Sequence, residues 1–319
     1  MAMRRLICTA LFALTVLCAS SSLGAGKLVG VVLTSDMSRY KDAYRAFVKG
    51  LAAQGFEQGL VEIVSQTPNP DSISWANSVR KLNAIKPDLI VTFGAPATLV
   101  AIQDTSSIPI VFADVYGPVE MQISRSMSRT GDNHCGISSK VPMATLVKSM
   151  TAIRPVKTLG ILFNSREAGS LVQLKELKRL AAQQGFAVRE ANVSSSSGLD
   201  AALEFLLTKS DCLFVSESSV VGRSLDKIVR KAGDARVPVI SLIPDAAERG
   251  ALVTLEVSPA DQGALAADYA AKILSGKKPG ELPVMTPRKV DFIINLSAAK
   301  ALGLHVPFRV LSDATKVLK

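Results

Sequence analysis

The sequence predicts an α/β protein of two doubly wound parallel-sheet lobes, joined by a hinge that the chain crosses three times. Three observations support this prediction: short, almost wholly apolar strands, amphipathic helices that alternate with them, and an internal repeat. Continuous apolar strands are typical of parallel sheets covered by helices on both faces. With 319 residues, of which 48% are hydrophobic and 20% charged, the chain is long enough to bury two cores.

The first 25 residues have the layout of a secretory signal peptide. Arg4 and Arg5 precede an apolar run over residues 6–19, and small polar residues follow up to Ala25. The run is shorter than the ~20 residues that a membrane-spanning helix needs, and no later stretch approaches that length. We therefore expect residues 1–25 to direct export to the periplasm and to be removed, leaving no segment inserted in the membrane.

Cysteine usage fits this interpretation. Val16 and Leu17 precede Cys18, whereas a lipoprotein processing site needs small residues there, so we do not expect a lipid anchor. Cys135 and Cys212 remain after export and lie in different predicted lobes. We expect both to be small buried residues and not a disulfide pair.

The chain repeats one pattern of elements after about 130 residues. Residues 30–56 (GVVLTSDMSRYKDAYRAFVKGLAAQGF) and 160–186 (GILFNSREAGSLVQLKELKRLAAQQGF) each contain an apolar strand, a polar loop, an amphipathic helix and a similar close. Two further pairs of segments continue the match: 86–96 with 209–219, and 107–115 with 236–244. Each half thus predicts one lobe built from right-handed β-α-β units.

The end of the chain does not follow the repeat. It predicts a strand over 250–257, a helix over 260–276 closed by Gly276, and a strand and a helix over 289–304. If the long helix packs on the first lobe and the last strand on the second, the chain crosses between the lobes near residues 136–142, 245–252 and 284–289. The predicted division is then 26–138 plus 251–286 for lobe 1, and 139–250 plus 287–319 for lobe 2.

Ligands of open parallel sheets bind beyond the carboxyl ends of the strands, so two facing lobes predict one cleft. After the strand at 89–91 the chain turns abruptly into a helix, and its first residues are candidate ligand contacts: Gly94, Ala95, Pro96 and Ala97. Free backbone N–H groups at such a helix N-terminus attract a carboxylate or phosphate. The alternative is that Gly94 and Pro96 only make a tight turn.

Other strand ends carry polar side chains that we also expect at the cleft. Those of the repeated first loops are Thr34 and Ser35 in one half and Asn164, Ser165 and Ser170 in the other. They could instead be helix caps only.

The remaining candidates follow one strand in each half: Asp114 and Tyr116, and Ser216, Glu217 and Ser218. Tyr116 could stack on a ring or an apolar group, and Asp114 or Glu217 could accept a hydrogen bond from an ammonium group. Asp114 could equally be a turn residue before Gly117.

Several function classes are poorly supported. The formal charge of +10 is spread along the chain and not interleaved with the 5% of aromatic residues, which argues against nucleic-acid binding. Metal and cofactor motifs are absent from the sequence, so we expect neither group. An exported hydrolase is the enzyme alternative, but no Gly-x-Ser-x-Gly motif occurs, and His134 and His305 are poorly placed as general bases. We therefore do not expect an enzyme.

Six segments together resemble one bacterial family, over nearly the whole chain after residue 25. They are TFGAPAT (92–98), IPIVFADVYGPV (108–119), NHCGIS (133–138), ILFNSREAGS (161–170), ERGALVTL (248–255) and IINLSAAKALGLHVP (293–307). They resemble the substrate-binding proteins of ABC importers of the tryptophan and tyrosine uptake type, which have the type I periplasmic binding fold. The resemblance implies capture of a small solute, often an amino acid, between closing lobes, and delivery to an ABC permease.

Three departures from the family pattern lie at the expected cleft. Gly117 stands where such proteins usually have Asp, Ser218 stands where an Asp often follows the strand at 212–215, and residues 257–260 replace an aromatic segment. Losing an Asp that pairs with an α-ammonium group removes a charge-assisted hydrogen bond of ~1.5–3 kcal/mol. Either Glu217 substitutes for it, or the ligand is not an ordinary amino acid.

The predicted function is therefore the periplasmic solute-binding component of an ABC importer, monomeric, with an amino acid or a related small carboxylate or amine as ligand. The alternative of a different class is a periplasmic sensor module that reports ligand occupancy to a membrane receptor. The sequence does not separate the two, because both use surfaces that flank the cleft.

Overall fold

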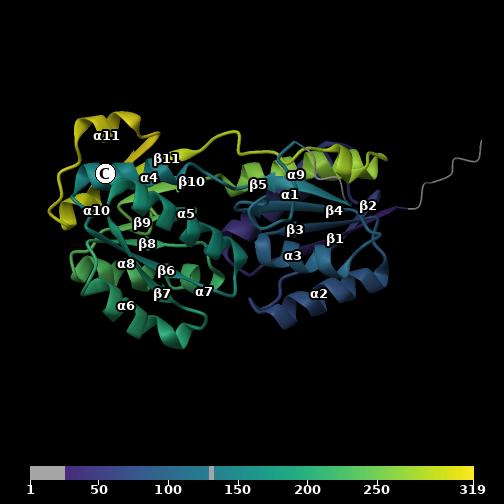
Figure 1. Ribbon diagram of the computed structural model, residues 1–319. Coiled ribbons are helices and arrows are strands. Elements are labelled where there is room, and N and C mark those ends of the chain that lie inside the picture. The colour runs from purple at the N-terminus through teal and green to yellow at the C-terminus, as the bar shows by residue number, and fades with distance from the viewer. Residues whose placement is uncertain (1–25, 129–132) are drawn as a thin grey trace, which may run out of the picture.

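The computed structural model describes residues 26–128 and 133–319. The predicted signal peptide, residues 1–25, lies outside the described residues. Figure 1 shows two lobes side by side, each with a central sheet and helices on both of its faces. The predicted α/β architecture of two doubly wound lobes is confirmed.

The first sheet is entirely parallel and has the strand order β2-β1-β3-β4-β5. Its strands are β1 (Lys27–Leu33), β2 (Val61–Gln66), β3 (Leu89–Phe93), β4 (Ile110–Val115) and β5 (His134–Ser138). All residues of β3 and β4 are buried, as expected for central strands of a parallel sheet covered on both faces, and so are those of the edge strand β5.

Four helices cover this sheet: α1 (Ser38–Ala53), α2 (Ser72–Ile85), α3 (Ala95–Asp104) and α9 (Pro259–Leu274). Helices α1 and α9 pack against each other on one face. Their contact is close at Gly263, where a Cβ atom would lie 1.9 Å from the backbone oxygen of Ala43. Helices α2 and α3 share the apolar cluster on the other face.

The second sheet has the strand order β12-β11-β10-β9-β8-β6-β7 and is parallel except for the pair β10 and β11. Its strands are β6 (Thr158–Phe163), β7 (Ala187–Asn192), β8 (Cys212–Val215), β9 (Val239–Ser241), β10 (Val253–Glu256), β11 (Asp291–Asn295) and β12 (Lys316–Leu318). The predicted second βαβ unit corresponds to β6 through β9.

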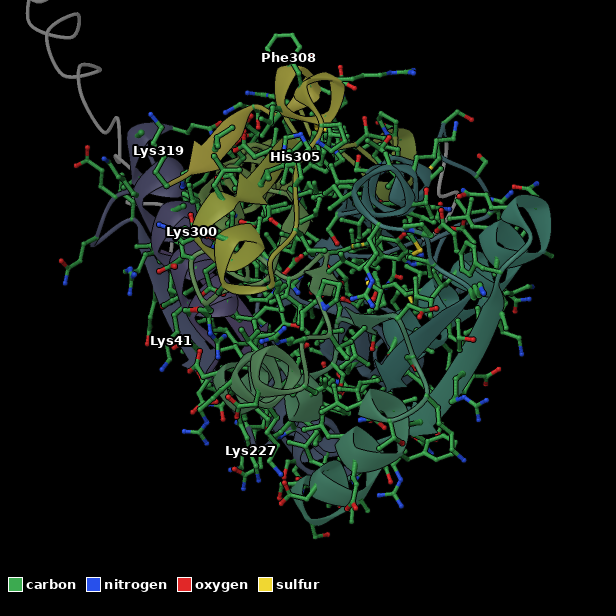
Figure 2. All side chains as sticks on the ribbon, turned by 90° about the vertical axis from the view of Figure 1, so that its left-hand side faces the viewer. Lys41, Lys227, Lys300, His305, Phe308 and Lys319 are labelled. Carbon is green, nitrogen blue, oxygen red and sulfur yellow. The ribbon has the colours of Figure 1, made fainter. Side chains whose placement is uncertain are left out.

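Helices cover both faces of this sheet as well. Those of the lobe are α4 (Met143–Ile153), α5 (Ala168–Gln184), α6 (Leu199–Leu207), α7 (Ser219–Arg223), α8 (Leu225–Asp234), α10 (Leu296–Ala301) and α11 (Phe308–Asp313), with a short 3-10 turn at Ser196–Gly198. A second 3-10 turn, Pro279–Glu281, follows α9 and lies against β5 of the first lobe. At the C-terminal end of the second lobe, Phe308 projects from α11 away from the body of the protein (Figure 2) and is 83% exposed.

One part of the predicted division is wrong. We expected residues 251–286 in lobe 1, but β10 pairs with β9 and with β11 in the second sheet. A strand of only four residues carries no sequence signal for the sheet that it joins, and its pairing with β9 and β11 decides the lobe. Helix α9, which follows, returns to lobe 1 as predicted.

The chain crosses between the sheets three times, as predicted. The crossings are residues 139–142, 257–258 and 286–290. The second crossing therefore follows β10, several residues after the expected position near 245–252. Cys135 and Cys212 are both buried, as predicted, in β5 and β8.

Candidate functional site

The carboxyl ends of the central strands of both sheets meet between the lobes. Four polar contacts join the lobes there, formed by the pairs Arg39–Glu217 (3.3 Å), Tyr116–Glu176 (2.8 Å), Asp36–Arg223 (2.5 Å) and Ser38–Asp245 (3.3 Å). The first two involve buried or half-buried side chains, and the others are exposed. The described conformation is thus one in which the lobes touch across the predicted cleft.

The centre of this cleft holds a buried ion pair between Arg39 and Asp114. Arg39 lies in the first turn of α1 and donates two hydrogen bonds to the carboxylate, from Nε to Oδ2 at 2.7 Å and from Nη2 to Oδ1. The two side chains are only 5% and 6% exposed. Burial lowers the pKa of Arg39, but Asp114 and Glu217 more than offset this and raise it well above its ordinary value, so the guanidinium stays charged.

The backbone at Asp114 is held in an unusual conformation. Its φ of 56° lies in the left-handed region, which non-glycine residues rarely adopt. Its N–H donates to Oε1 of Gln262 at 2.9 Å, and the amide of Gln262 donates to the backbone oxygen of Ser138 at 3.2 Å. Asp114 thus has the backbone conformation of a turn residue, as one of the two expectations for it had it. Its carboxylate, which the other expectation offered to a ligand, is bound through both oxygens to Arg39.

Glu217 faces Arg39 from the other lobe. It lies at the start of the loop after β8, and its N–H donates to Oε1 of Gln173 at 2.8 Å. Burial raises the pKa of Glu217 to about 7, while Arg39 opposes that shift. Burial therefore disfavours the charged form of this carboxyl group, and the positive charge of Arg39 partly offsets that effect.

A third carboxylate, Glu167, lies nearby and is 5% exposed. It is the N-cap residue of α5 and accepts hydrogen bonds from Asn164 Nδ2 at 2.8 Å, Ser218 Oγ at 2.8 Å and the N–H of Ser219 at 3.0 Å. Two predicted site residues, Asn164 and Ser218, thus hold this buried carboxylate in the described conformation.

The turn after β3 is packed tightly against lobe 1 itself. Gly94 has a φ of 97°, and a Cβ atom there would lie 2.5 Å from Thr34 Oγ1 and 2.9 Å from the Tyr40 ring. The N–H of Ala97 donates to Thr34 Oγ1 at 3.4 Å. The tight-turn interpretation of Gly94 thus has a structural basis, whereas ligand contact by this helix N-terminus stays a prediction.

The remaining predicted residues fall into two groups. Ser170 and Ser216 are buried and joined at 2.6 Å between their hydroxyl oxygens, and Ser35 is fully buried with no partner for its hydroxyl. Ser165, in contrast, is exposed and exchanges hydrogen bonds with Asn192 at the end of β7. The other thirteen predicted residues lie buried or half-buried at the strand ends that face the cleft: Thr34, Ser35, Gly94, Ala95, Pro96, Ala97, Asp114, Tyr116, Asn164, Ser170, Ser216, Glu217 and Ser218.

Sequence reasoning missed several buried polar residues here, among them Arg39, Glu167 and Gln173. A signal for Arg39 existed, because Ala43, Phe47 and Leu51 follow it at intervals of four and form the buried face of α1. Gln173 similarly precedes Leu174 and Leu177 on the buried face of α5. A charged or amide side chain in such a stripe indicates a buried polar role.

A groove of about 650 Å³ runs between the lobes beside the Tyr116–Glu176 hydrogen bond. Its lining includes Glu120, Met121, Lys140, Leu171, Val172 and Glu176. Residues from lobe 1, from the first crossing and from α5 thus form one depression at the edge of the cleft.

Two structural features are absent from the described part of the chain. Within residues 26–128 and 133–319, no three or more His, Cys, Asp or Glu side chains are grouped so that they could hold a metal ion. No helix in these ranges is long and apolar enough to cross a membrane.

The two lobes, their three crossings and the polar cleft define a substrate-binding protein of the periplasmic binding type. The sequence matches the family of ABC transporter substrate binding proteins over residues 29–318, and the chain belongs to this family. It is 26% identical over 295 residues to a tyrosine-binding protein of Clostridioides difficile, covering 92% of this chain and 85% of that protein.

Solved structures agree with this assignment. The ABC domain in complex with L-Trp from Streptococcus pneumonia has a TM-score of 0.87 at 24% identity, with 92% of this chain and all of that chain covered. A conserved domain protein from Vibrio cholerae has a TM-score of 0.88 at 29% identity, again with 92% of this chain and all of that chain covered. The ligand-free, open structure of a substrate binding protein with adhesive properties from Clostridium difficile scores 0.69 at 27% identity, over 92% of this chain and 99% of that one.

Proposed function

We propose that this protein is the periplasmic solute-binding component of an ABC importer, and that it captures a small molecule bearing an amino group between its two lobes. The observation that carries the proposal is the buried polar cluster at the meeting point of the strand ends, with Arg39 and Asp114 from one lobe and Glu217 from the other. Such a cluster is costly to bury unless its charges are paired or bound.

The comparison of conformations supports closure on a ligand. At similar sequence identity, the described chain superposes better on the L-Trp complex than on the ligand-free, open structure. The cross-lobe contacts of Arg39 and Tyr116 are consistent with a closed state. We infer that the crossings at 139–142, 257–258 and 286–290 form the hinge.

The proposal assigns no chemistry on the ligand to this chain. The buried carboxylates are bound to arginine, serine and asparagine side chains or to backbone N–H groups, and none of these pairs resembles a nucleophile with its base. We expect the protein to act as a monomer that delivers its ligand to a membrane permease.

Binding calorimetry of the purified protein with a panel of amino acids, amines and small carboxylates tests the proposal. One class should bind with 1:1 stoichiometry and raise the melting temperature, because a ligand of the folded form adds RT ln(1 + [L]/Kd) to its stability. Loss of uptake of that solute in cells lacking the protein would distinguish transport from sensing. Indifference to the whole panel, combined with hydrolysis of an ester or peptide, would contradict the proposal.

A further inference from the structure

The cleft holds more negative than positive groups. Arg39 is the one buried lysine or arginine in the described residues, while Asp114 and Glu167 are buried and the Glu217 side chain is 12% exposed. Three carboxylates thus lie in this region with a single buried guanidinium, which contacts two of them, Asp114 and Glu217. Because charge in a water-poor site needs a partner or a neutralising proton, the cleft favours a further cation over a further anion.

The three carboxylates differ in how well they are compensated. Asp114 receives two hydrogen bonds from Arg39, and Glu167 receives its hydrogen bonds from neutral donors on Asn164, Ser218 and Ser219. Glu217 has only the 3.3 Å contact with Nη2 of Arg39, a nitrogen that already donates to Asp114. Glu217 is therefore the carboxylate that an incoming cation would stabilise most.

Several donors that could receive a ligand carboxylate are already engaged, although Nη1 of Arg39 is not. Nε and Nη2 of Arg39 both donate to Asp114. The N–H of Ala97, at the N-terminus of α3, donates to Thr34 Oγ1. A second anion in this cleft would add to the excess of negative charge, whereas a cation would reduce it.

Buried polar atoms without partners lie on residues that contact these carboxylates. Gln173 accepts from the N–H of Glu217, and its Nε2 has no partner although the residue is 0% exposed. Ser219 donates its N–H to Glu167, and its hydroxyl has no partner at 2% exposure. Buried polar atoms are normally hydrogen-bonded, but each of these two atoms lacks a partner, and a hydroxyl oxygen on the ligand could accept from either.

We propose that the ligand is an organic monocation without a free carboxylate, whose cationic group replaces Arg39 as the partner of Glu217. Arg39 then stays on Asp114 as a neutral pair. An organic cation fits better than a metal ion, because no group of metal-binding side chains occurs in residues 26–128 and 133–319. This inference rests on the proposed solute-binding function and narrows its ligand class.

Matched triples of ligands test the inference by calorimetry at about pH 8, where Glu217, with its pKa of about 7, is mainly ionised. The triples are tyramine, L-tyrosine and 3-(4-hydroxyphenyl)propanoate; tryptamine, L-tryptophan and indole-3-propanoate; and pentylamine, L-norleucine and hexanoate. We expect the amine of at least one triple to bind ten times or more tighter than its amino acid, and its carboxylate to bind weakest.

The variant Glu217→Gln should lower affinity for that amine about ten- to a hundredfold, the value of a hydrogen bond to a charged group. Glu204→Gln, at an exposed position of α6 in the same lobe, is the matched control and should bind like the unmodified protein. Circular dichroism of both variants confirms that they are folded.

Other outcomes separate this inference from the function that it rests on. An amino acid that binds as tightly as its amine, or tighter, would overturn the inference and show that Arg39 receives a carboxylate, while solute binding would stand. A carboxylate that binds tightest would overturn it as well. No binding in any triple would contradict both the inference and the proposed function.

Discussion

Arg39 and Asp114, 75 residues apart in the chain, form a doubly hydrogen-bonded ion pair that fastens the start of α1 to the end of β4. The pair lies inside lobe 1 and faces Glu217 of lobe 2. It holds the two elements together and places a guanidinium opposite the Glu217 carboxylate.

Arg39→Met should destabilise the protein strongly, because it leaves the Asp114 carboxylate buried without its partner. Breaking a buried ion pair on one side typically costs about 3–5 kcal/mol. Urea unfolding measures the change, with Lys41→Met, at an exposed position of α1, as the control. The double variant Arg39→Met, Asp114→Asn should recover part of the loss, because Asn is uncharged and tolerates the left-handed conformation at this position. Equal stability of the Arg39 and Lys41 variants would show that the pair contributes nothing.

Gly94→Ala tests whether the turn after β3 is shaped by packing. The new methyl group would lie 2.5 Å from Thr34 Oγ1, and the φ of 97° disfavours any side chain. Gly55→Ala has a similar φ of 89° but open space around the new atom. We expect the Gly94 variant to lose at least 1 kcal/mol more, about the size of a steric conflict in a packed site. Equal losses would mean that only φ matters at Gly94.

Glu217 should make the stability depend on pH. Burial raises its pKa to about 7, from an ordinary value of 4.5, with Arg39 opposing the shift. The folded protein therefore binds this proton more tightly than the unfolded chain. The free energy of unfolding should fall as the pH rises from about 4.5 to 7 and level off above 7.

The size of this effect should be roughly 2–4 kcal/mol, since the pKa rises from 4.5 to about 7 and each pKa unit corresponds to about 1.4 kcal/mol. Burial also raises the pKa values of Asp245 and Glu256, which act with the same sign. The difference between the unmodified protein and Glu217→Gln, measured at several pH values, isolates Glu217. A difference that does not change with pH would contradict the shifted pKa.

The fold could be predicted from the sequence where it depends on interactions between residues that are close together in the chain. The continuous apolar strands and the repeated helices were enough to predict both lobes. The polar and turn residues that follow the strands showed where most strands end. Strand β10 was assigned to the wrong lobe, because its partner β11 lies 35 residues further along the chain and only long-range pairing fixes its sheet.

The candidate site was predictable in position but not in its charges. Asp114 and Glu217 were found because they follow apolar strands. Arg39 and Glu167 occupy first-turn and N-cap positions of helices, where charged residues are usually exposed, and only the packing of α1 and α5 buries them. The sequence does not show that Arg39 lies beside Asp114, so the expectation of a free Asp114 carboxylate could not take this ion pair into account.

Tyr116→Phe should favour the open state. The hydroxyl of Tyr116 donates to Glu176 across the lobes at 2.8 Å, and a hydrogen bond of this kind contributes about 0.5–1.5 kcal/mol. Small-angle scattering of the ligand-free protein should then show a larger radius of gyration. Tyr44→Phe, on α1 at a half-buried position, should leave that radius unchanged. An unchanged radius in the Tyr116 variant would show that this contact does not hold the lobes together.

A crystal structure of the protein with the tightest-binding solute of the matched triples tests the central claim most directly. The account predicts that the solute is enclosed between the lobes, with its cationic nitrogen within hydrogen-bonding distance of the Glu217 carboxylate and the Arg39–Asp114 pair intact. A solute bound outside the cleft, or one whose nitrogen lies away from Glu217, would contradict it.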